Sequence, residues 1–448
     1  MRRFLAACLV ACSSHGAPQP VVATKHDVPP PAVVSNAWIE DDYARALADA
    51  KKANAPLFVD TSAVWCHTCK AMRAFVLDDA SLPKSFVRLS IDVEKDQNAS
   101  AVAAFPSHVL PTFFIVDPSD GSIHGRWEGA GSIQQMRTFM NDAAQSIAMA
   151  HAGSLKPDDP LALLLAGHRA TLQRDAKGAE AAFAKALEKA PANWDHTTEA
   201  LLGLIKAKEH TGNGCAQEAE RVLSGAQLGR SSLAADYASE AMDCVEKDES
   251  PRGKHVREMV AKYVADLAKD DAVPLSPDDR ADAWKIVWDA REAMGDKPGA
   301  QDAARARLAV IEKAIAGKEP ELTTTFDGAR METLEYLGRG QEAAQFLEAQ
   351  EKALPSDYNP AHRLAHVYFK LKRYDDALAA VGRALPKSYG ARKGLILRLK
   401  ADILLAQNKK ADARAALEEQ LALYKSLPEA QKKPGFEQKV QEQIDKLK

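Results

Sequence analysis

The sequence predicts two structural classes in one chain, a small α/β domain over residues 35–152 and an all-α region over residues 158–448. Up to about residue 152, apolar runs of strand length alternate with helical patterns, as in a small α/β sheet. From Leu161 to Leu447 the apolar spacing is helical only. Abundant alanine, with only 6% aromatic residues, favours close helix packing in this larger part.

Length and charge set further bounds. The 448 residues are too many for one ordinary core, so more than one domain is expected. The formal net charge is −3, and no segment combines dense basic charge with stacking aromatic residues. A nucleic-acid partner is therefore not expected.

The first residues form a targeting pattern. A basic start, Met1-Arg2-Arg3, precedes an apolar run that ends at Ala11. This run is too short to span a bilayer, which takes about 20 apolar residues. We therefore interpret residues 1–11 as a signal peptide, although a misread start codon would also explain them.

The stretch Leu9-Val10-Ala11-Cys12 resembles the lipobox of bacterial lipoproteins. The resemblance implies cleavage before Cys12, lipidation of this cysteine, and a periplasm-facing place in the cell envelope. An ordinary cleaved signal with a chance cysteine is the alternative. Ser13, where an aspartate would favour the inner membrane, slightly favours the outer one. Residues 12–34, rich in proline, then form a tether.

The α/β region is predicted element by element. Ser35 is expected to cap a first helix that Pro56 ends. Its buried face would hold Ile39, Tyr43, Leu47 and Ala50. Strands are expected at 57–59, 86–91, 112–116 and, at an edge, 124–127, and helices at 70–76 and 133–149.

One hexapeptide, Trp65-Cys66-His67-Thr68-Cys69-Lys70, lies between the first strand and a helix. Two cysteines separated by two residues can close a disulfide ring. Asp60 stands six residues before Cys66, and Leu110-Pro111-Thr112 precedes a later strand. This pattern resembles the thioredoxin superfamily. More narrowly, it is similar to the bacterial group that includes the C-terminal periplasmic domain of the transmembrane disulfide reductase.

The resemblance assigns roles to these residues. Cys66 would be the nucleophile, because a helix N-terminus stabilises a thiolate, and Cys69 would resolve the mixed disulfide. Asp60, with a pKa raised by burial, would accept the proton of Cys69. Pro111, if cis, would bring the Leu110 backbone beside the sulfurs, where an extended substrate pairs. The remaining matches are Trp65, Lys70, a glycine at Gly129, and Arg88, where a lysine commonly partners the buried acid.

Two alternatives to a redox site are a structural disulfide and half of a metal site, and the residues in register around the motif weigh against both. His67 would tune the thiolate or be an exposed turn residue, and His67-Thr68 does not decide the direction of electron flow. The wider pattern favours a reductase or exchange role. No cofactor is expected.

Of the other cysteines, Cys8 leaves with the signal peptide, and the sequence leaves open whether Cys215 and Cys244 pair. Neither belongs to a second Cys-x-x-Cys, so no zinc site is expected. His362 and His366 stand four apart, a spacing that can hold a metal. We expect instead that they line a polar groove with Lys370, because no third ligand is evident.

The helical region resembles the tetratricopeptide repeat, a helix pair of about 34 residues with small residues where the helices cross. The first match is carried by Gly167, Ala179, Phe183, Ala186 and Pro191. Later matches lie at 337–355, 364–384 and 401–417, and residues 195–320 are helical with a degenerate signature. Phe436, Val440, Ile444 and Leu447 form the stripe of a capping helix.

Two function classes follow. In the first, the chain is an envelope thiol-disulfide oxidoreductase that exchanges with protein thiols or disulfides and with a redox donor or acceptor protein. Its helical repeats would recruit a protein client. In the second, the chain is an envelope scaffold whose thioredoxin fold serves mainly as an adaptor. The complete Trp-Cys-x-x-Cys-Lys motif favours the first.

Overall fold

The computed structural model describes residues 37–107, 109–225, 227–432 and 435–447. The predicted signal peptide, the tether and Cys12 lie outside the described residues. Within the described residues, no helix combines the length and the apolar composition that a membrane span requires.

A five-stranded mixed sheet forms the core of the N-terminal region, with strand order β1-β3-β2-β4-β5. β1, β3 and β2 run parallel, and β4 and β5 continue the sheet in antiparallel fashion. The strands are β1 (Trp38–Glu40), β2 (Leu57–Ser62), β3 (Val87–Asp92), β4 (Thr112–Val116) and β5 (Ile123–Glu128). The four predicted strands are confirmed, the last as an edge strand.

Helices cover both faces of this sheet. They are α1 (Tyr43–Ala53), α2 (His67–Met72, extended by a π-helical turn at Arg73–Leu77), α3 (Ala99–Ala104) and α4 (Ile133–His151). α1 and α3 pack on the face that contains Val59 and Leu89. The α2 segment and α4 pack on the face that contains Phe58 and Phe113.

The predicted start of the first helix is wrong. Residues 38–40 form the edge strand β1, which pairs with β3, and α1 begins only after Asp42, whose carboxylate accepts a hydrogen bond from Arg45 N. Three residues are too few to show an alternating pattern, and the acidic residues after them resemble the first turn of a helix. Ile39 is therefore buried in the sheet and not on the helix.

The C-terminal region is helical throughout its described residues, as predicted. Consecutive helices pack as neighbours, with the closest pairing between α5 and α6, α11 and α12, and α18 and α19. The longer helices are α5 (Pro160–Leu172), α6 (Ala176–Lys189), α7 (Thr197–Thr211), α8 (Cys215–Ser224), α9 (Ser232–Asp243), α10 (Pro251–Lys269), α11 (Pro277–Ala293), α12 (Lys297–Ile315), α14 (Asp327–Tyr336), α15 (Gly340–Ala353), α16 (Asn359–Lys370), α17 (Tyr374–Ala384), α18 (Gly390–Ala406), α19 (Lys410–Ser426) and α20 (Phe436–Asp445).

Small residues stand where these helices cross. At Gly167 a Cβ atom would lie 2.5 Å from the Phe183 ring, so only glycine admits this approach of α5 to α6. Ala179 and Ala186 of the same predicted repeat are buried. Val440 and Ile444 of α20 pack on α19 as the expected cap.

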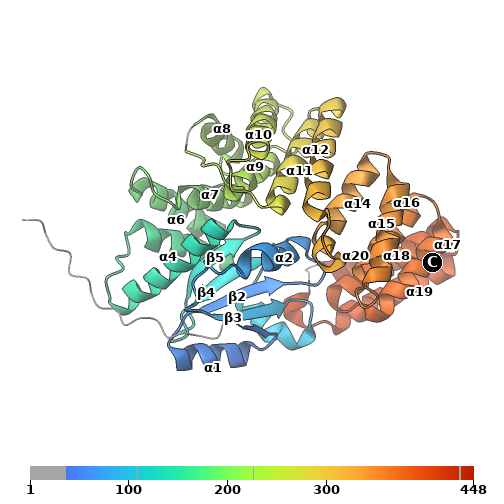
Figure 1. Ribbon diagram of the computed structural model, residues 1–448, viewed down its shortest axis with the longest axis horizontal. Helices are drawn as coiled ribbons and strands as arrows, with labels where there is room; N and C mark the ends of the chain where they lie inside the picture. The colour runs from blue at the N-terminus through green and yellow to red at the C-terminus, as the bar shows by residue number, and fades with distance from the viewer. Residues whose placement is uncertain (1–36, 108, 226, 433–434, 448) are drawn as a thin grey trace, which may run out of the picture.

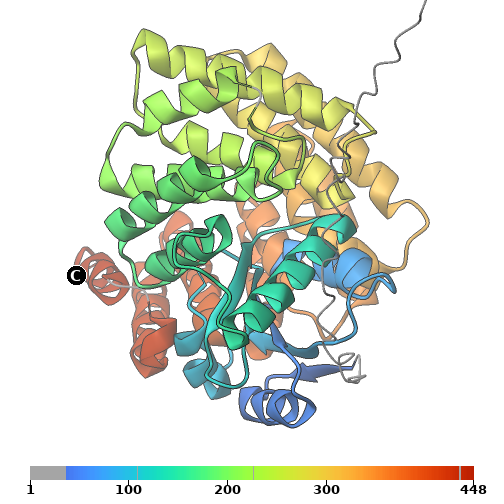
Figure 2. The ribbon, with the colours of Figure 1, turned by 90° about the vertical axis from the view of Figure 1, so that its left-hand side faces the viewer.

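The helical region wraps around the α/β domain (Figures 1 and 2). From α6 to α12 the helices arch over the sheet, and α14 to α19 continue down one side of it in Figure 1. One hydrophobic core passes from the sheet into this arch, since Phe113 and Phe139 belong to the same buried cluster as Ile205 and Val260. The helical region therefore meets the α/β domain over a broad surface.

Candidate redox site

Cys66 and Cys69 lie at the start of α2. Cys66 is the N-cap residue, and its sulfur accepts a hydrogen bond from Cys69 N over 3.0 Å. The two cysteines form a disulfide, with their Cα atoms 5.2 Å apart. Their exposed fractions are only 3% and 5%. The first cysteine thus faces the unpaired N–H groups of a helix N-terminus, which stabilise a thiolate.

Asp60 lies in the middle of β2, opposite Ser90 on one side and Phe113 on the other. It is 3% exposed, and its Oδ1 atom has no hydrogen-bond partner. Burial raises the pKa of Asp60 to about 7; Arg73 opposes this shift and Glu40 adds to it. The direction is the one expected from the sequence, and it leaves Asp60 able to exchange a proton near neutral pH.

Asp60 and Cys69 line the same cavity, which has a volume of about 500 Å³. Asp60, Cys69 and Lys70 line one side of it, and Asp357 and Tyr389 from the helical region line the other. The cavity is large and polar enough to hold water. A proton that leaves Cys69 therefore has a polar space beside Asp60 in which to move.

The expected pairing of Arg88 with Asp60 is wrong. Arg88 Nη1 donates to Leu77 O over 2.8 Å, and the same atom lies 4.0 Å from a carboxylate oxygen of Asp78. In the sheet, Arg88 is opposite Phe58, which lies two residues before Asp60. Its side chain is therefore directed to the Leu77 carbonyl and the Asp78 carboxylate, at the end of the α2 segment. The cation that acts on Asp60 is Arg73.

The loop before β4 approaches the cysteines as expected. The Leu110–Pro111 peptide bond is cis, and Leu110 packs against the buried cluster of Ala63, Cys66 and Cys69. Pro111 O accepts a hydrogen bond from Gly129 N over 2.8 Å. The structure thus brings the predicted proline segment, the predicted glycine and both cysteines together.

Residues of the motif also contact the helical region, which the sequence did not indicate. The guanidinium of Arg392 lies 4.7 Å from the centroid of the Trp65 ring. Lys70 Nζ donates to Thr324 Oγ1 and lies 3.4 Å from Asp357 Oδ2. The helical region therefore forms a wall of the redox site.

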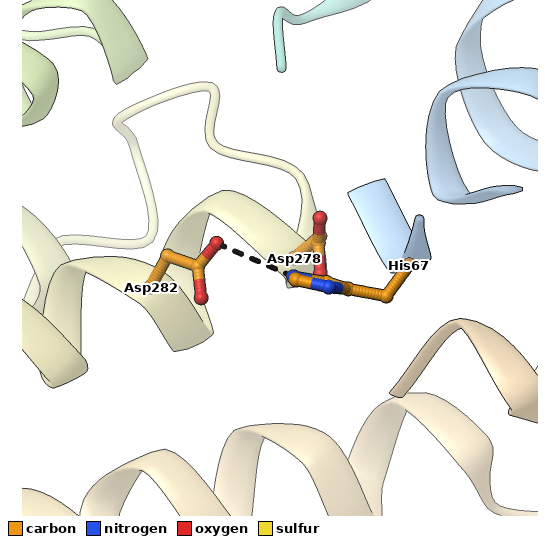
Figure 3. A group of neighbouring side chains, drawn as sticks. All are labelled: His67, Asp278 and Asp282. Atoms are coloured by element: carbon orange, nitrogen blue, oxygen red, sulfur yellow. Dashed lines mark ion pairs between the residues drawn. The ribbon is translucent and has the colours of Figure 1, made fainter. Parts of the chain in front are cut away.

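His67 faces α11, and this contact also was not indicated by the sequence (Figure 3). Its Nε2 atom lies 3.9 Å from Asp282 Oδ2, and the Asp278 carboxylate lies beside the ring (Figure 3). Burial and the nearby Asp282 carboxylate raise the pKa of Asp278 to about 7. Among the described residues, His67, Asp278 and Asp282 are a group whose ligand atoms could hold a metal ion. The two carboxylates are more than 200 residues away in the chain, and no local motif signals them.

His362 and His366 lie on α16 with their ring centroids 4.9 Å apart. Burial, with Arg392 nearby, lowers the pKa of His366 to about 4 and the pKa of His362 well below its usual value. Burial therefore favours the neutral form of both rings. Lys370 lies on an exposed part of α16, and its Nζ atom lies 2.6 Å from Glu335 Oε2 of α14.

The N-terminal ends of α16 and α18 contact the α/β domain. Asn359 Nδ2 donates to Val64 O over 3.1 Å. In the neighbouring helix α18, Arg392 N donates to Glu94 Oε2 over 2.8 Å, and Tyr389, just before it, donates to Asp92. These contacts hold the α/β domain against the N-terminal ends of α16 and α18. The polar groove predicted along His362, His366 and Lys370 stays a prediction.

Cys215 and Cys244 are also joined, which answers the question that the sequence left open. Cys215 begins α8 and Cys244 follows α9, and their Cα atoms lie 5.5 Å apart. Both pack against the core that the two regions share. This disulfide fastens two consecutive helices of the helical region.

Comparison with known proteins agrees with this geometry. Residues 38–118 match a family described as thioredoxin-like. This part of the chain is a thioredoxin-like domain. The match includes the Cys-x-x-Cys motif of the thioredoxin-like domain, Asp60 and the Leu110–Pro111 segment.

Among solved structures, a tetratricopeptide repeat protein from Parabacteroides merdae is similar to the chain at 15% identity, with a TM-score of 0.41. The similarity covers 64% of this chain and 96% of that protein. No curated protein matches the chain.

Proposed function

We propose that the protein is a thiol-disulfide oxidoreductase that acts on protein thiols and disulfides through Cys66. The observation that carries the proposal is the joint placement of the Cys66–Cys69 disulfide at the N-terminus of α2 and of Asp60 beside the same cavity as Cys69. A purely structural disulfide needs neither a buried acid with an unpartnered oxygen nor a polar cavity next to it.

The reaction would proceed by two displacements. In the reduced enzyme, the Cys66 thiolate attacks a substrate disulfide, forms a mixed disulfide, and releases one substrate sulfur as a thiolate. Cys69 then gives its proton to Asp60 and attacks the sulfur of Cys66. This step releases the second substrate thiolate and leaves the Cys66–Cys69 disulfide. Two electrons have passed to the substrate, and a reducing partner protein must return them.

We favour the reductase or exchange direction, because the residues around the motif resemble the reducing group. Reduction potentials in comparable proteins range from about −270 to about −120 mV. His67 and Thr68 do not place this protein within that range. Equilibration of the reduced and oxidised protein with glutathione would measure its potential.

The helical region would recruit the protein client or the redox partner. Helix pairs of the repeat type commonly present extended binding surfaces. Here Trp65 and Lys70 contact this region directly. A client that reaches Cys66 must therefore pass residues of both regions.

A scaffold function is the second candidate, and the burial of Cys66 favours it. A nucleophile that is 3% exposed meets large substrates only after some rearrangement. Under this alternative the thioredoxin-like domain is an adaptor inside the helical arch. A Cys66→Ser protein that fully performs the cellular role would support the scaffold and contradict the enzyme.

We also propose that the protein is a bacterial envelope lipoprotein, anchored through Cys12 and facing the periplasm, with the outer membrane slightly favoured. This proposal rests on the basic start, the short apolar run and the lipobox-like sequence before Cys12. Mass spectrometry of the N-terminal peptide would detect a diacylglyceryl group on Cys12. An unmodified cysteine or an uncleaved leader would contradict the proposal.

The decisive experiment for the enzyme is covalent trapping. In a Cys69→Ser protein the mixed disulfide at Cys66 cannot be resolved, so clients remain attached and can be identified by mass spectrometry. A Cys66→Ser/Cys69→Ser protein is the matched control. Specific adducts in the first and none in the second support the oxidoreductase. An absence of adducts, together with no disulfide exchange by the wild-type protein in vitro, would exclude it.

A further inference from the structure

Three side chains with metal-binding atoms meet next to the Cys-x-x-Cys motif (Figure 3). His67 is the first residue of α2, and Asp278 and Asp282 lie on successive turns of α11. A spacing of four residues puts both carboxylates on one face of this helix. One nitrogen or oxygen atom from each side chain lies within 4.8 Å of the other two.

Asp278 is the residue that points to a ligand. It is 2% exposed, and neither of its carboxylate oxygens has a partner in hydrogen-bonding geometry. A buried carboxylate without a partner is costly, and a bound cation would compensate it directly.

The other two side chains leave matching atoms free. The distance of 3.9 Å between His67 Nε2 and Asp282 Oδ2 is too long for a hydrogen bond, and His67 Nε2 has no other partner. The second oxygen of Asp282 lies 3.5 Å from Arg307 Nη2. Arg307 thus contacts the carboxylate oxygen that does not face His67, and such second contacts commonly orient the ligands of metal sites.

The donor set indicates the class of cation. One imidazole nitrogen and two carboxylate oxygens suit Zn²⁺ and related transition metals, whereas Ca²⁺ takes six to eight oxygen ligands. Zinc–ligand distances of about 2.0–2.2 Å place ligand atoms roughly 3.5 Å apart. The three side chains would need to move inward by about 1 Å at most.

We propose that His67, Asp278 and Asp282 bind a divalent transition-metal cation that joins the Cys-x-x-Cys helix to the helical region. The cation would leave at least one coordination position for water, since the protein supplies three ligands. The simpler alternative is an ion pair between a protonated His67 and Asp282 with no metal. The two differ in measurable zinc binding, and neither depends on the proposed redox function.

The test is a Zn²⁺ titration of the full, oxidised protein by calorimetry. Oxidation is essential, because reduced thiols would themselves bind zinc. We expect one equivalent to bind, and Asp278→Asn, Asp282→Asn and His67→Gln each to weaken binding at least about tenfold. Asp289→Asn, on an exposed site of the same helix, and the double variant His362→Gln/His366→Gln should bind as the wild type does.

A second measurement distinguishes a lost metal site from a variant that fails to fold. Circular dichroism of each metal-free variant shows whether it is folded, and any one folded variant of the three is sufficient. In the wild type, zinc should raise the melting temperature, because it binds the native state, and in the variants this rise should be lost. No binding by the wild type, or binding that all three substitutions leave unchanged, would overturn the proposal.

Discussion

The two disulfides of this protein lie in different surroundings, although each has one cysteine at the start of a helix. Cys66 caps α2 and Cys215 begins α8. Cys66 and Cys69 are three positions apart, whereas 29 positions separate Cys215 from Cys244. The first pair has a buried acid and a polar cavity beside it, and the second packs on an apolar core. A helix N-terminus is thus common to both pairs, whereas the acid, the cavity and the proline loop are found only beside the Cys66–Cys69 pair, which we propose to be redox-active.

The largest expected effect separates the pairs by activity. Cys66→Ser should reduce the rate of disulfide reduction at least about a thousandfold, since it removes the nucleophile. Cys215→Ala/Cys244→Ala should keep the wild-type rate within about twofold. Turbidimetric insulin reduction with a thiol donor measures both rates. Equal losses of reduction rate in the two variants would contradict the proposal that only the Cys66–Cys69 pair is catalytic.

The second effect separates them by stability. Loss of the Cys215–Cys244 disulfide should lower the free energy of unfolding by about 3–4 kcal/mol, because it closes a long loop in the unfolded chain. Loss of the Cys66–Cys69 disulfide should cost about 2 kcal/mol at most, because its loop is short. Urea unfolding of the two double-alanine variants gives the comparison, and a reversed order would contradict it.

Asp60→Asn should lower the exchange rate about 10–100-fold, because Cys69 loses its proton acceptor. The wild-type rate should rise with pH through an apparent pKa near 7, the value to which burial raises Asp60, and the variant should lack this step. Stopped-flow measurements between pH 5 and 9 test the profile.

The same substitution should stabilise the protein above pH 7. Native Asp60 retains its proton up to about pH 7, whereas the unfolded chain loses it near pH 4, so stability contributed by this group falls as the pH rises through that window. Asn avoids the cost, which amounts to up to about 4 kcal/mol. Thermal melts should show a clearly larger advantage of the variant at pH 8 than at pH 5, because only part of the cost is present at pH 5.

The smallest effect concerns the wall that the helical region places over the redox site. Arg392→Ala removes the guanidinium over Trp65, a contact worth about 0.5–1 kcal/mol. Alkylation of Cys66 in the reduced protein should become about two- to fivefold faster. Arg414→Ala, on α19, where the arginine pairs with Glu418 of the same helix, is the control. An unchanged rate would mean that this wall does not restrict access to Cys66.

The sequence was sufficient for the fold class because its signals are local. Thr112–Val116 is a continuous apolar run, and the structure has a strand with these bounds. Gly167 and Phe183 stand at repeat spacing, and they meet where α5 crosses α6. The strand β1 was missed because three residues carry no readable alternation, and acidic residues after it resemble a helix start.

The parts of the site that could not be predicted are those that depend on distant contacts. The cysteines, Asp60 and the proline segment share a local pattern, and the structure brings them together. Arg88 occupies the expected sequence position, but the Leu77 carbonyl captures its side chain. Nothing near residue 67 in the sequence indicates that Asp278 and Asp282 face it, because that contact depends on how the helical arch closes over the domain.

The shared core has a consequence for how the molecule holds together. Met136 and Phe139 of α4 belong to the same buried cluster as side chains from α7, α9 and α10, and Lys206 of α7 lies 2.7 Å from Glu128 at the end of β5. Separation of the two regions would expose this apolar surface to water. We therefore expect the thioredoxin-like domain and the helical region to unfold together in one cooperative transition, although the sequence changes character near residue 155.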